Sequence, residues 1–276
     1  MTTAAAAAPH LPPGSKQPGT RPVRPRTSWS TYALLAGAIA VSAWALIGIE
    51  FDLRPLWQDF GRGWFIIREF FSPSWPFLVR TIPAWTETLS IAVLATLAGC
   101  GVGLIAAMLA SKVTARNTLV YRTSKLLLSA VRSLPDVGYG LLLVALVGVG
   151  SLAGILALIM FNIGIIAKLT AETIDAIDPG PLEAADASGA DGLQRARLTV
   201  LPQILPNYLS YCLYVFELNI RASVVIGIVG GGGIGSVIQV ELGRFNYSNL
   251  SSIIVLLIVV VFSIDQFSRF LRRRII

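Results

Sequence analysis

Three pairs of oppositely charged residues lie within long apolar stretches of this 276-residue chain, and they are the residues best placed to bind an ion. The pairs are Arg132 with Asp136, Lys168 with Glu172, and Glu217 with Arg221. Side chains four positions apart meet on one face of a helix. Charges inside a membrane are costly and commonly functional, so these cations could contact an anionic substrate. The alternative is that each pair neutralises itself, as a structural or gating element.

A run of glycines, Gly230–Gly235, follows the last of these pairs. Arg221 ranks first as a substrate contact because its segment leads directly into this run, and Arg221→Gln is then expected to abolish uptake while leaving assembly intact. Backbone N–H groups of Gly232 and Gly233 could contribute to an anion path. The run lacks the Lys-Ser/Thr ending of a nucleotide-binding P-loop. The simpler interpretation is a flexible outer turn, packed at a dimer centre or against a partner protein.

Residues for catalysis or metal binding are scarce. The one histidine, His10, lies in the N-terminal tail, and Cys100 and Cys212 lie in apolar runs. An enzyme would need a recognisable nucleophile, base or metal cluster, and the sequence offers none. The chain is therefore expected not to be an enzyme and to bind no cofactor itself.

Composition indicates an all-α, polytopic membrane protein. Hydrophobic residues make up 54% of the chain and charged residues 13%, whereas soluble domains carry about 25% charged residues. Six apolar stretches are long enough to cross about 30 Å of hydrocarbon as helices. The predicted spans are about 31–50, 86–110, 126–149, 152–174, 206–229 and 250–268.

The distribution of charge orients these spans. Of the 22 Lys and Arg residues, fourteen fall in presumed cytoplasmic stretches, five on the opposite side and three within the membrane. This is the positive-inside pattern, with both termini in the cytoplasm, and it argues against nucleic-acid binding of the +7 chain. Residues 1–28 are expected to form a disordered tail and 29–276 the transmembrane domain. Within it, the aromatic-rich segment 51–85 is predicted to be an extracytoplasmic amphipathic element at the lipid interface.

A polar segment, residues 175–205, separates the fourth and fifth predicted spans. Asp178 is a candidate cap for a short helix starting near Pro181, and Gly189 can end that helix in a left-handed conformation. Asp191 is a candidate cap for a second helix that ends before Pro202 and Pro206. The small side chains on the first helix allow close approach by a partner.

This segment resembles the cytoplasmic coupling loop of ABC-importer permeases. The family pattern is Glu-Ala-Ala, three residues, Gly, nine residues, Ile, one residue and Leu-Pro. The residues in register are Glu183, Ala184, Ala185, Gly189, Leu201 and Pro202, with Ala190 beside the glycine. Thr199 departs from the pattern by standing at the Ile position, where it is expected to weaken packing of the second helix.

Further motifs are similar to those of phosphonate-importer permeases, over roughly residues 80–276. They are Arg132–Asp136, Ile177–Pro181, Val200–Gln203, Phe216–Arg221, Gly230–Gly235, Gly243–Phe245 and Ser263–Asp265. Gly231 stands where the family usually has Ala. The resemblance implies a type I importer fold in a bacterial cell membrane. It also implies a second copy of the chain, two ATPase subunits that use ATP and Mg²⁺, and an extracytoplasmic phosphonate-binding protein. Phosphite, phosphate and phosphate esters are further candidate cargoes.

Two alternatives stay open beside this hypothesis. One is a permease of a related ABC importer for another small solute. The other is an ion-coupled secondary transporter, which would be expected to show inverted internal repeats and a membrane-embedded ion site. No such repeat is visible in the sequence.

Overall fold

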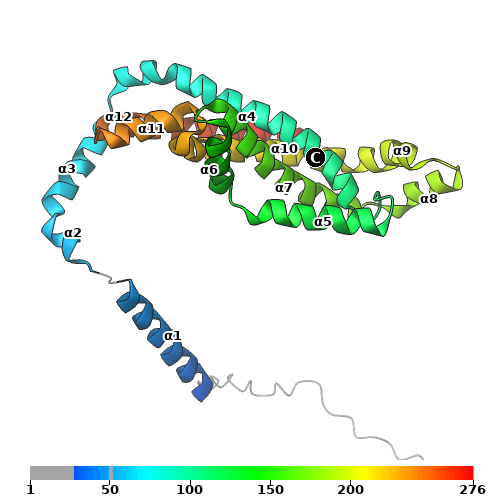
Figure 1. Ribbon diagram of the computed structural model, residues 1–276, viewed down its shortest axis with the longest axis horizontal. Coiled ribbons are helices and arrows are strands. Elements are labelled where there is room, and N and C mark those ends of the chain that lie inside the picture. Colours follow the sequence, from blue (N-terminus) through cyan, green and yellow to red (C-terminus); the bar gives the residue numbers. More distant parts are fainter. Residues whose placement is uncertain (1–27, 50–51, 276) are drawn as a thin grey trace, which may run out of the picture. The chain divides into compact units, whose positions relative to one another are not determined.

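The computed structural model describes residues 28–49 and 52–275, and every regular element within them is helical (Figure 1). The chain divides into two compact units, Met1–Phe60 and Gly61–Ile276, which are treated separately here. Apart from Ser28, the predicted N-terminal tail lies outside the described residues.

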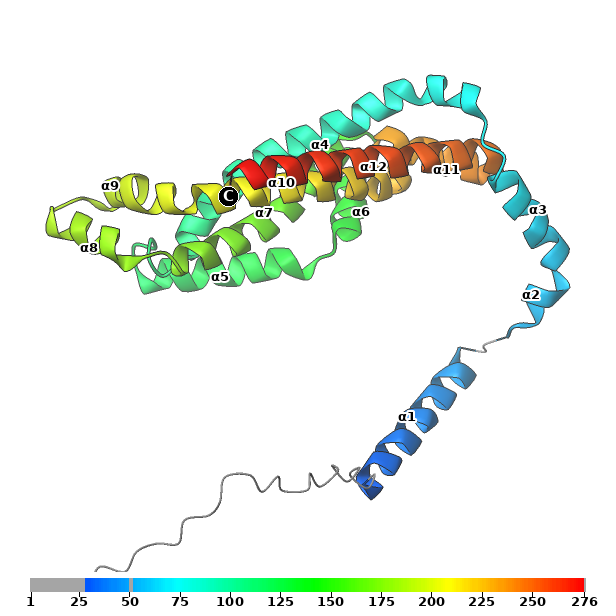
Figure 2. The same cartoon turned by 180° about the vertical axis from the view of Figure 1, so that it is seen from behind.

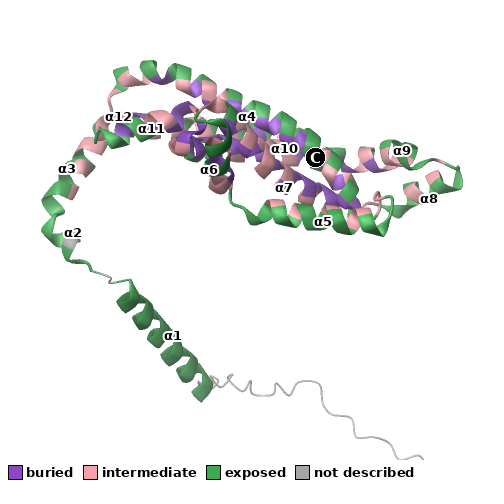
Figure 3. Ribbon diagram, viewed as in Figure 1, coloured by how far each residue is buried: buried purple, intermediate pink, exposed green. Residues whose placement is uncertain are grey.

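The first unit contributes α1 (Trp29–Gly48) and the short α2 (Arg54–Gln58). At 1.5 Å per residue, the 20 residues of α1 span about 30 Å, which is the thickness of the hydrocarbon core. No residue of α1 is buried, as Figure 3 shows by its uniform colour. An apolar helix without a protein-facing side suits lipid surroundings, in agreement with the first predicted span.

The second unit begins with α3 (Phe60–Phe70) and α4 (Trp75–Ala110). The predicted second span began at residue 86, but α4 starts at Trp75 and contains Pro83. The hydroxyl of Ser248 donates to the carbonyl of Ser72 at 2.6 Å, which ties the α3–α4 connection to the start of α12 (Tyr247–Ile275). The aromatic-rich segment is therefore helical for most of its length.

The bundle is built around α4 and α7 (Ser151–Asp175), with α10 (Leu201–Ile226) and α12 beside them (Figures 1 and 2). Small residues let α4 and α7 approach closely. A Cβ at Gly99 would lie 2.5 Å from Cβ of Asn162, and one at Gly103 would lie 2.7 Å from Cγ2 of Ile166. Such contacts are typical of helix pairs in membranes, where apolar side chains gain nothing by leaving lipid.

The third predicted span is broken. Helix α5 (Thr118–Ser133) and α6 (Asp136–Val147) meet at an angle of 86° across Leu134-Pro135. Proline removes a backbone donor and holds the residue before it in an extended conformation, which ends α5. The described residues contain five helices long and apolar enough to cross a membrane, or six if this bent pair counts as one.

The fifth predicted span is longer than expected at both ends. Helix α9 (Gly192–Arg195), the π-helical stretch η1 (Ala196–Val200) and α10 follow without a break, so Pro202 and Pro206 do not separate them. The wider turn of η1 accommodates a proline that cannot donate to the preceding turn. Beyond α10, the expected outer turn is a short segment, η2 (Gly227–Gly231), which is kinked at Gly230 and followed by α11 (Gly233–Gly243).

Candidate functional site

The polar segment forms two short helices at one end of the bundle, where α8 (Pro179–Ala187) and α9 lie beyond the long helices (Figures 1 and 2). The side chain of Asp178 accepts from the N–H of Gly180 at 2.9 Å and caps α8. Gly189 has a φ of +75°, and the N–H of Ala190 donates to the carbonyl of Ala185 at 3.0 Å. The predicted cap and the predicted left-handed end of the first helix are confirmed.

The predicted cap of the second helix is confirmed as well. The N–H of Gln194 donates to Asp191 at 2.8 Å, and the N–H of Asp191 donates to the Gln194 side chain at 3.0 Å. Both ends of this capping box satisfy donors that a helix start leaves free.

Arg195, which the motif comparison did not single out, holds the segment together. Its guanidinium lies 3.3 Å from the Asp186 carboxylate on α8 and donates to the carbonyl of Val113 in the α4–α5 connection at 2.9 Å. The N–H of Asp178 donates to the Gln203 side chain at 3.1 Å, which anchors the start of α8 to α10. The polar segment is therefore bonded to the bundle at both of its ends.

Most of the residues that match the coupling-loop pattern are exposed. Glu183, Ala184, Gly189 and Pro202 are exposed, while Ala185, Ala190 and Leu201 are half-buried. Two large apolar side chains also stand in the open, because Leu193 is 79% and Leu198 68% exposed. Single exposed leucines are common on protein surfaces, so these two are of interest because the motif match surrounds them.

Thr199 has a role in the π-helical stretch. Its hydroxyl donates to the carbonyl of Arg195 at 2.6 Å, and the Gln203 side chain donates to the carbonyl of Thr199 at 3.0 Å. A π-turn shifts the regular pattern of backbone hydrogen bonds. The hydroxyl supplies a bond there that isoleucine could not.

Two of the three charge pairs are in contact. Lys168 Nζ lies 3.5 Å from Glu172 on α7, and an Arg221 guanidinium nitrogen lies 2.6 Å from Glu217 on α10. Arg132 and Asp136 are on different helices across the 86° bend, so the expected contact on one helix face does not form. Asp136 instead accepts from the N–H of Val137 at 2.9 Å, at the start of α6.

Glu217 is held from two helices. Besides Arg221, the guanidinium of Arg272 on α12 lies 3.2 Å from its second oxygen. Its side chain is only 11% exposed. We call Glu217, Arg221 and Arg272 the α10–α12 clamp. A neighbouring cavity of about 480 Å³ is lined by Glu217, Arg221 and Asp265, and Asp265 in turn pairs with Arg269.

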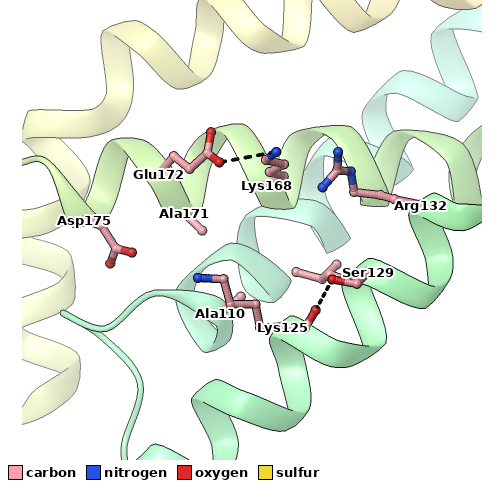
Figure 4. A pocket seen from close by; sticks show the side chains of 9 residues that line it. Ala110, Lys125, Ser129, Arg132, Lys168, Ala171, Glu172 and Asp175 are labelled. Atoms are coloured by element: carbon pink, nitrogen blue, oxygen red, sulfur yellow. Dashed lines mark hydrogen bonds and ion pairs between the residues drawn. The ribbon is translucent and has the colours of Figure 1, made fainter.

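Arg132 and Lys168 come together in a second cavity, of about 280 Å³, between α5 and α7. Figure 4 shows their side chains beside those of Lys125, Glu172 and Asp175. Asp175 is already engaged, because it accepts from the Ser111 hydroxyl at 2.6 Å and the N–H of Lys112 at 2.8 Å. We call this the α5–α7 cavity. Helical periodicity places Lys125 on the same face as Arg132 and Asp175 on the same face as Lys168, but it cannot show that these two faces meet.

The glycine run is a packed bend. Gly230, Gly232 and Gly233 have φ values of +106°, +83° and +67°, which strain any residue with a side chain. A Cβ at Gly232 would lie 2.6 Å from a carboxylate oxygen of Glu87. The N–H of Ile234 donates to the Thr88 hydroxyl at 2.7 Å. The run is therefore fixed against α4 of the same chain, where the sequence suggested a flexible turn.

Comparison with known proteins shows which family the chain belongs to. Residues 99–276 match the family described as binding-protein-dependent transport system inner membrane component. A phosphite transport system permease protein of Stutzerimonas stutzeri is 37% identical over 187 residues, covering 68% of each chain. An Escherichia coli permease protein named for a cryptic phosphonate transport system is 40% identical over 121 residues, covering 44% of this chain and 99% of its own.

The fold agrees with these sequence matches. The structure of the MetNI methionine ABC transporter in an inward-facing conformation superposes with a TM-score of 0.64 at 26% identity, covering 74% of this chain and 99% of the matched one. Together with the family match, this fold is that of the permease subunit of a type I ABC importer. The chain belongs to the binding-protein-dependent inner membrane permeases, and it is a multi-pass inner membrane transport subunit, not an enzyme. The family implies ATPase and substrate-binding partners.

Proposed function

We propose that this permease imports phosphorus oxyanions: phosphonates foremost, with phosphite, phosphate and phosphate esters as further cargoes. The names of the relatives, which include phosphite and phosphonate systems, support this class. The observation that carries the proposal is Arg132 in the α5–α7 cavity, which has no ion-pair partner among the described residues, because a guanidinium fork suits a tetrahedral oxyanion. A permease for another small solute is the second candidate, favoured by the likeness to a methionine transporter.

The working unit in this proposal is two copies of the chain, two cytoplasmic ATPase subunits and an extracytoplasmic phosphonate-binding protein. Both termini and the α8–α9 segment face the cytoplasm. Leu193 and Leu198 then enter a groove of the ATPase, beside the small residues of α8. The permease itself binds no cofactor, since ATP and Mg²⁺ belong to the ATPase.

Transport proceeds by alternating access. Closure of the two ATPase subunits on ATP moves the α8–α9 segments, and the paired bundles turn from inward-facing to outward-facing. Because Arg195 and Gln203 bond the segment to the α4–α5 connection and to α10, its displacement moves both. Arg132, Lys168 and Glu172 are placed on the substrate path, with Asp136 at the start of α6. Gly232 and Gly233 serve as a gating element, whereas Glu217, held by Arg221 and Arg272, links α10 to α12.

Uptake into liposomes tests the proposal. The complete transporter, with binding protein outside and ATP inside, is offered radiolabelled methylphosphonate, phosphite, phosphate or methionine. We expect uptake of at least one phosphorus oxyanion and none of methionine. The double variant Leu193→Ser/Leu198→Ser should lose uptake and release the ATPase on purification, whereas Leu205→Ser, an exposed leucine on α10, should keep both. Uptake of methionine alone would reject the cargo class and leave the permease assignment intact.

A further inference from the structure

We propose that the α5–α7 cavity is a binding site for a small tetrahedral phosphorus oxyanion, held chiefly by the Arg132 guanidinium with help from Lys168. The ligand class rests on the proposed function. The position of the site and the side chains that would hold the anion come from the structure.

Arg132 is presented to the cavity by two features. Helix α5 ends at Ser133, so Asp136 is carried away on α6 and cannot neutralise the guanidinium. Gly164 of α7 is buried against the stem of Arg132, and a Cβ there would lie 2.8 Å from Cγ of Arg132. The missing side chain makes room for the arginine stem. The guanidinium then lies at the cavity beside Lys168 (Figure 4).

The charges around the cavity leave positive charge for a ligand. Lys125, Arg132 and Lys168 face it together with Glu172 and Asp175. Asp175 is bonded to Ser111 and to the backbone of Lys112, and Glu172 pairs with Lys168. In the part of the chain that the structure describes, no hydrogen bond or ion pair engages the Arg132 guanidinium. Arg132 is therefore the cation that an incoming oxyanion meets without displacing a protein partner.

Lys168 becomes available at little cost. It lies 3.5 Å from Glu172, and the side chains are 43% and 62% exposed. Ion pairs between exposed side chains are weak, so an oxyanion can replace the carboxylate. Lys125 contributes less, because its ammonium group donates to the Tyr121 hydroxyl at 2.7 Å and lies over the ring of that residue.

The size of the cavity fits a small anion, and its position is near the coupling segment. Drug-sized ligands occupy pockets of about 300–1,000 Å³, so a cavity of about 280 Å³ suits a phosphonate or phosphate. The cavity follows α7 from Lys168 to Asp175, and Asp175 is the last residue before the connection to α8. Two acidic side chains at its edge weaken binding. This arrangement suits an anion that must leave when the coupling segment moves.

The same chemistry has two sources, a free phosphorus oxyanion and the phosphate of an anionic lipid headgroup. The experiment therefore uses the assembled permease–ATPase complex in nanodiscs, without binding protein or nucleotide. In one arm the lipid is phosphatidylcholine alone, and binding of radiolabelled phosphate and methylphosphonate is measured by equilibrium dialysis. In the other arm phosphatidylglycerol is added, the same dialysis is repeated, and lipid retained after extraction is measured by native mass spectrometry.

We expect Arg132→Gln to weaken phosphate binding at least about tenfold, since a charge-assisted bidentate contact is lost. Arg273→Gln, an exposed arginine near the end of α12, should bind as the unmodified complex does. Gly164→Ala keeps every charge and displaces only the arginine stem, so it should weaken binding by a smaller factor. It also serves where Arg132→Gln fails to assemble.

Three outcomes decide the matter. Arg132-dependent phosphate binding in both lipids identifies the free oxyanion as the ligand. Arg132-dependent retention of phosphatidylglycerol, with phosphate bound only in its absence, identifies the headgroup and still supports the site. Phosphate and phosphatidylglycerol binding that is absent, or the same in Arg132→Gln, overturns it. Phosphite uptake by the unmodified transporter, measured separately, shows whether the proposed cargo class fails along with the site.

Discussion

The α10–α12 clamp and the α5–α7 cavity have the same sequence signature and different surroundings. Both contain an acid and a base four residues apart on one helix. The Glu217 side chain is 11% exposed and contacts two arginines, whereas the Glu172 side chain is 62% exposed and contacts one lysine. A buried carboxylate between two cations holds helices together, because its partners cannot leave without exposing a charge to low dielectric. An exposed pair can exchange partners. The difference favours a structural role for the clamp and a binding role for the cavity.

Glu217→Gln is expected to have the largest effect on stability. The change leaves Arg221 and Arg272 without their shared carboxylate, and α10 loses its charged link to α12. Breaking a buried pair costs about 3–5 kcal/mol. Because half of the Arg221 side chain is exposed, the pair is not fully buried, and we expect about 2 kcal/mol here. Thermal unfolding of the purified permease in detergent measures the change.

The matched control for that variant is Glu172→Gln, which removes the same carboxylate from an exposed pair. Its unfolding temperature should stay close to that of the unmodified protein. Equal losses of stability in the two variants would remove the distinction between clamp and cavity.

Arg221→Gln is expected to have the next largest effect on stability. It distinguishes the substrate contact expected from sequence from the structural role seen in the clamp. From sequence, Arg221 was the first candidate for substrate contact, with uptake lost and assembly intact. In the structure Glu217 keeps Arg272 when Arg221 is removed, so we expect a stability loss of about 1 kcal/mol. Uptake should fall only in proportion to the amount of assembled transporter. The measurement is uptake per assembled complex in liposomes. Complete loss of that uptake would show that Arg221 contributes to the substrate path.

Local features of this fold were predictable from sequence. The caps at Asp178 and Asp191 and the left-handed Gly189 were predicted correctly, because each depends on residues at most a few positions away. The apolar runs likewise located the long helices, since a span needs only length and hydropathy. Such signals do not depend on the rest of the chain.

What escaped prediction depends on tertiary contacts or on backbone geometry that composition does not encode. Pro135 lies in the third predicted span, but a proline alone does not predict an 86° bend, so the expectation that Arg132 and Asp136 meet on one helix face is wrong. The glycine run was expected to be a flexible outer turn, whereas it packs against Glu87 and Thr88 of α4. The partners that make Arg132 available, Gly164 among them, lie on another helix.

The smallest expected effect is the change in phosphate affinity caused by Glu172→Gln. If Glu172 competes with the oxyanion for Lys168, its removal frees the ammonium group, and phosphate should bind more tightly. The pair is worth about 0.5 kcal/mol on a helix surface, which corresponds to roughly a twofold gain in affinity. Equilibrium dialysis of the nanodisc complex resolves a change of that size. Lys168→Gln should weaken binding, and the Lys168→Gln/Glu172→Gln double variant should bind no more tightly than Lys168→Gln alone. Weaker binding in Glu172→Gln would mean that the carboxylate positions Lys168 for the anion, and then the exposed pair would be a fixed part of the site, as Glu217 is of the clamp.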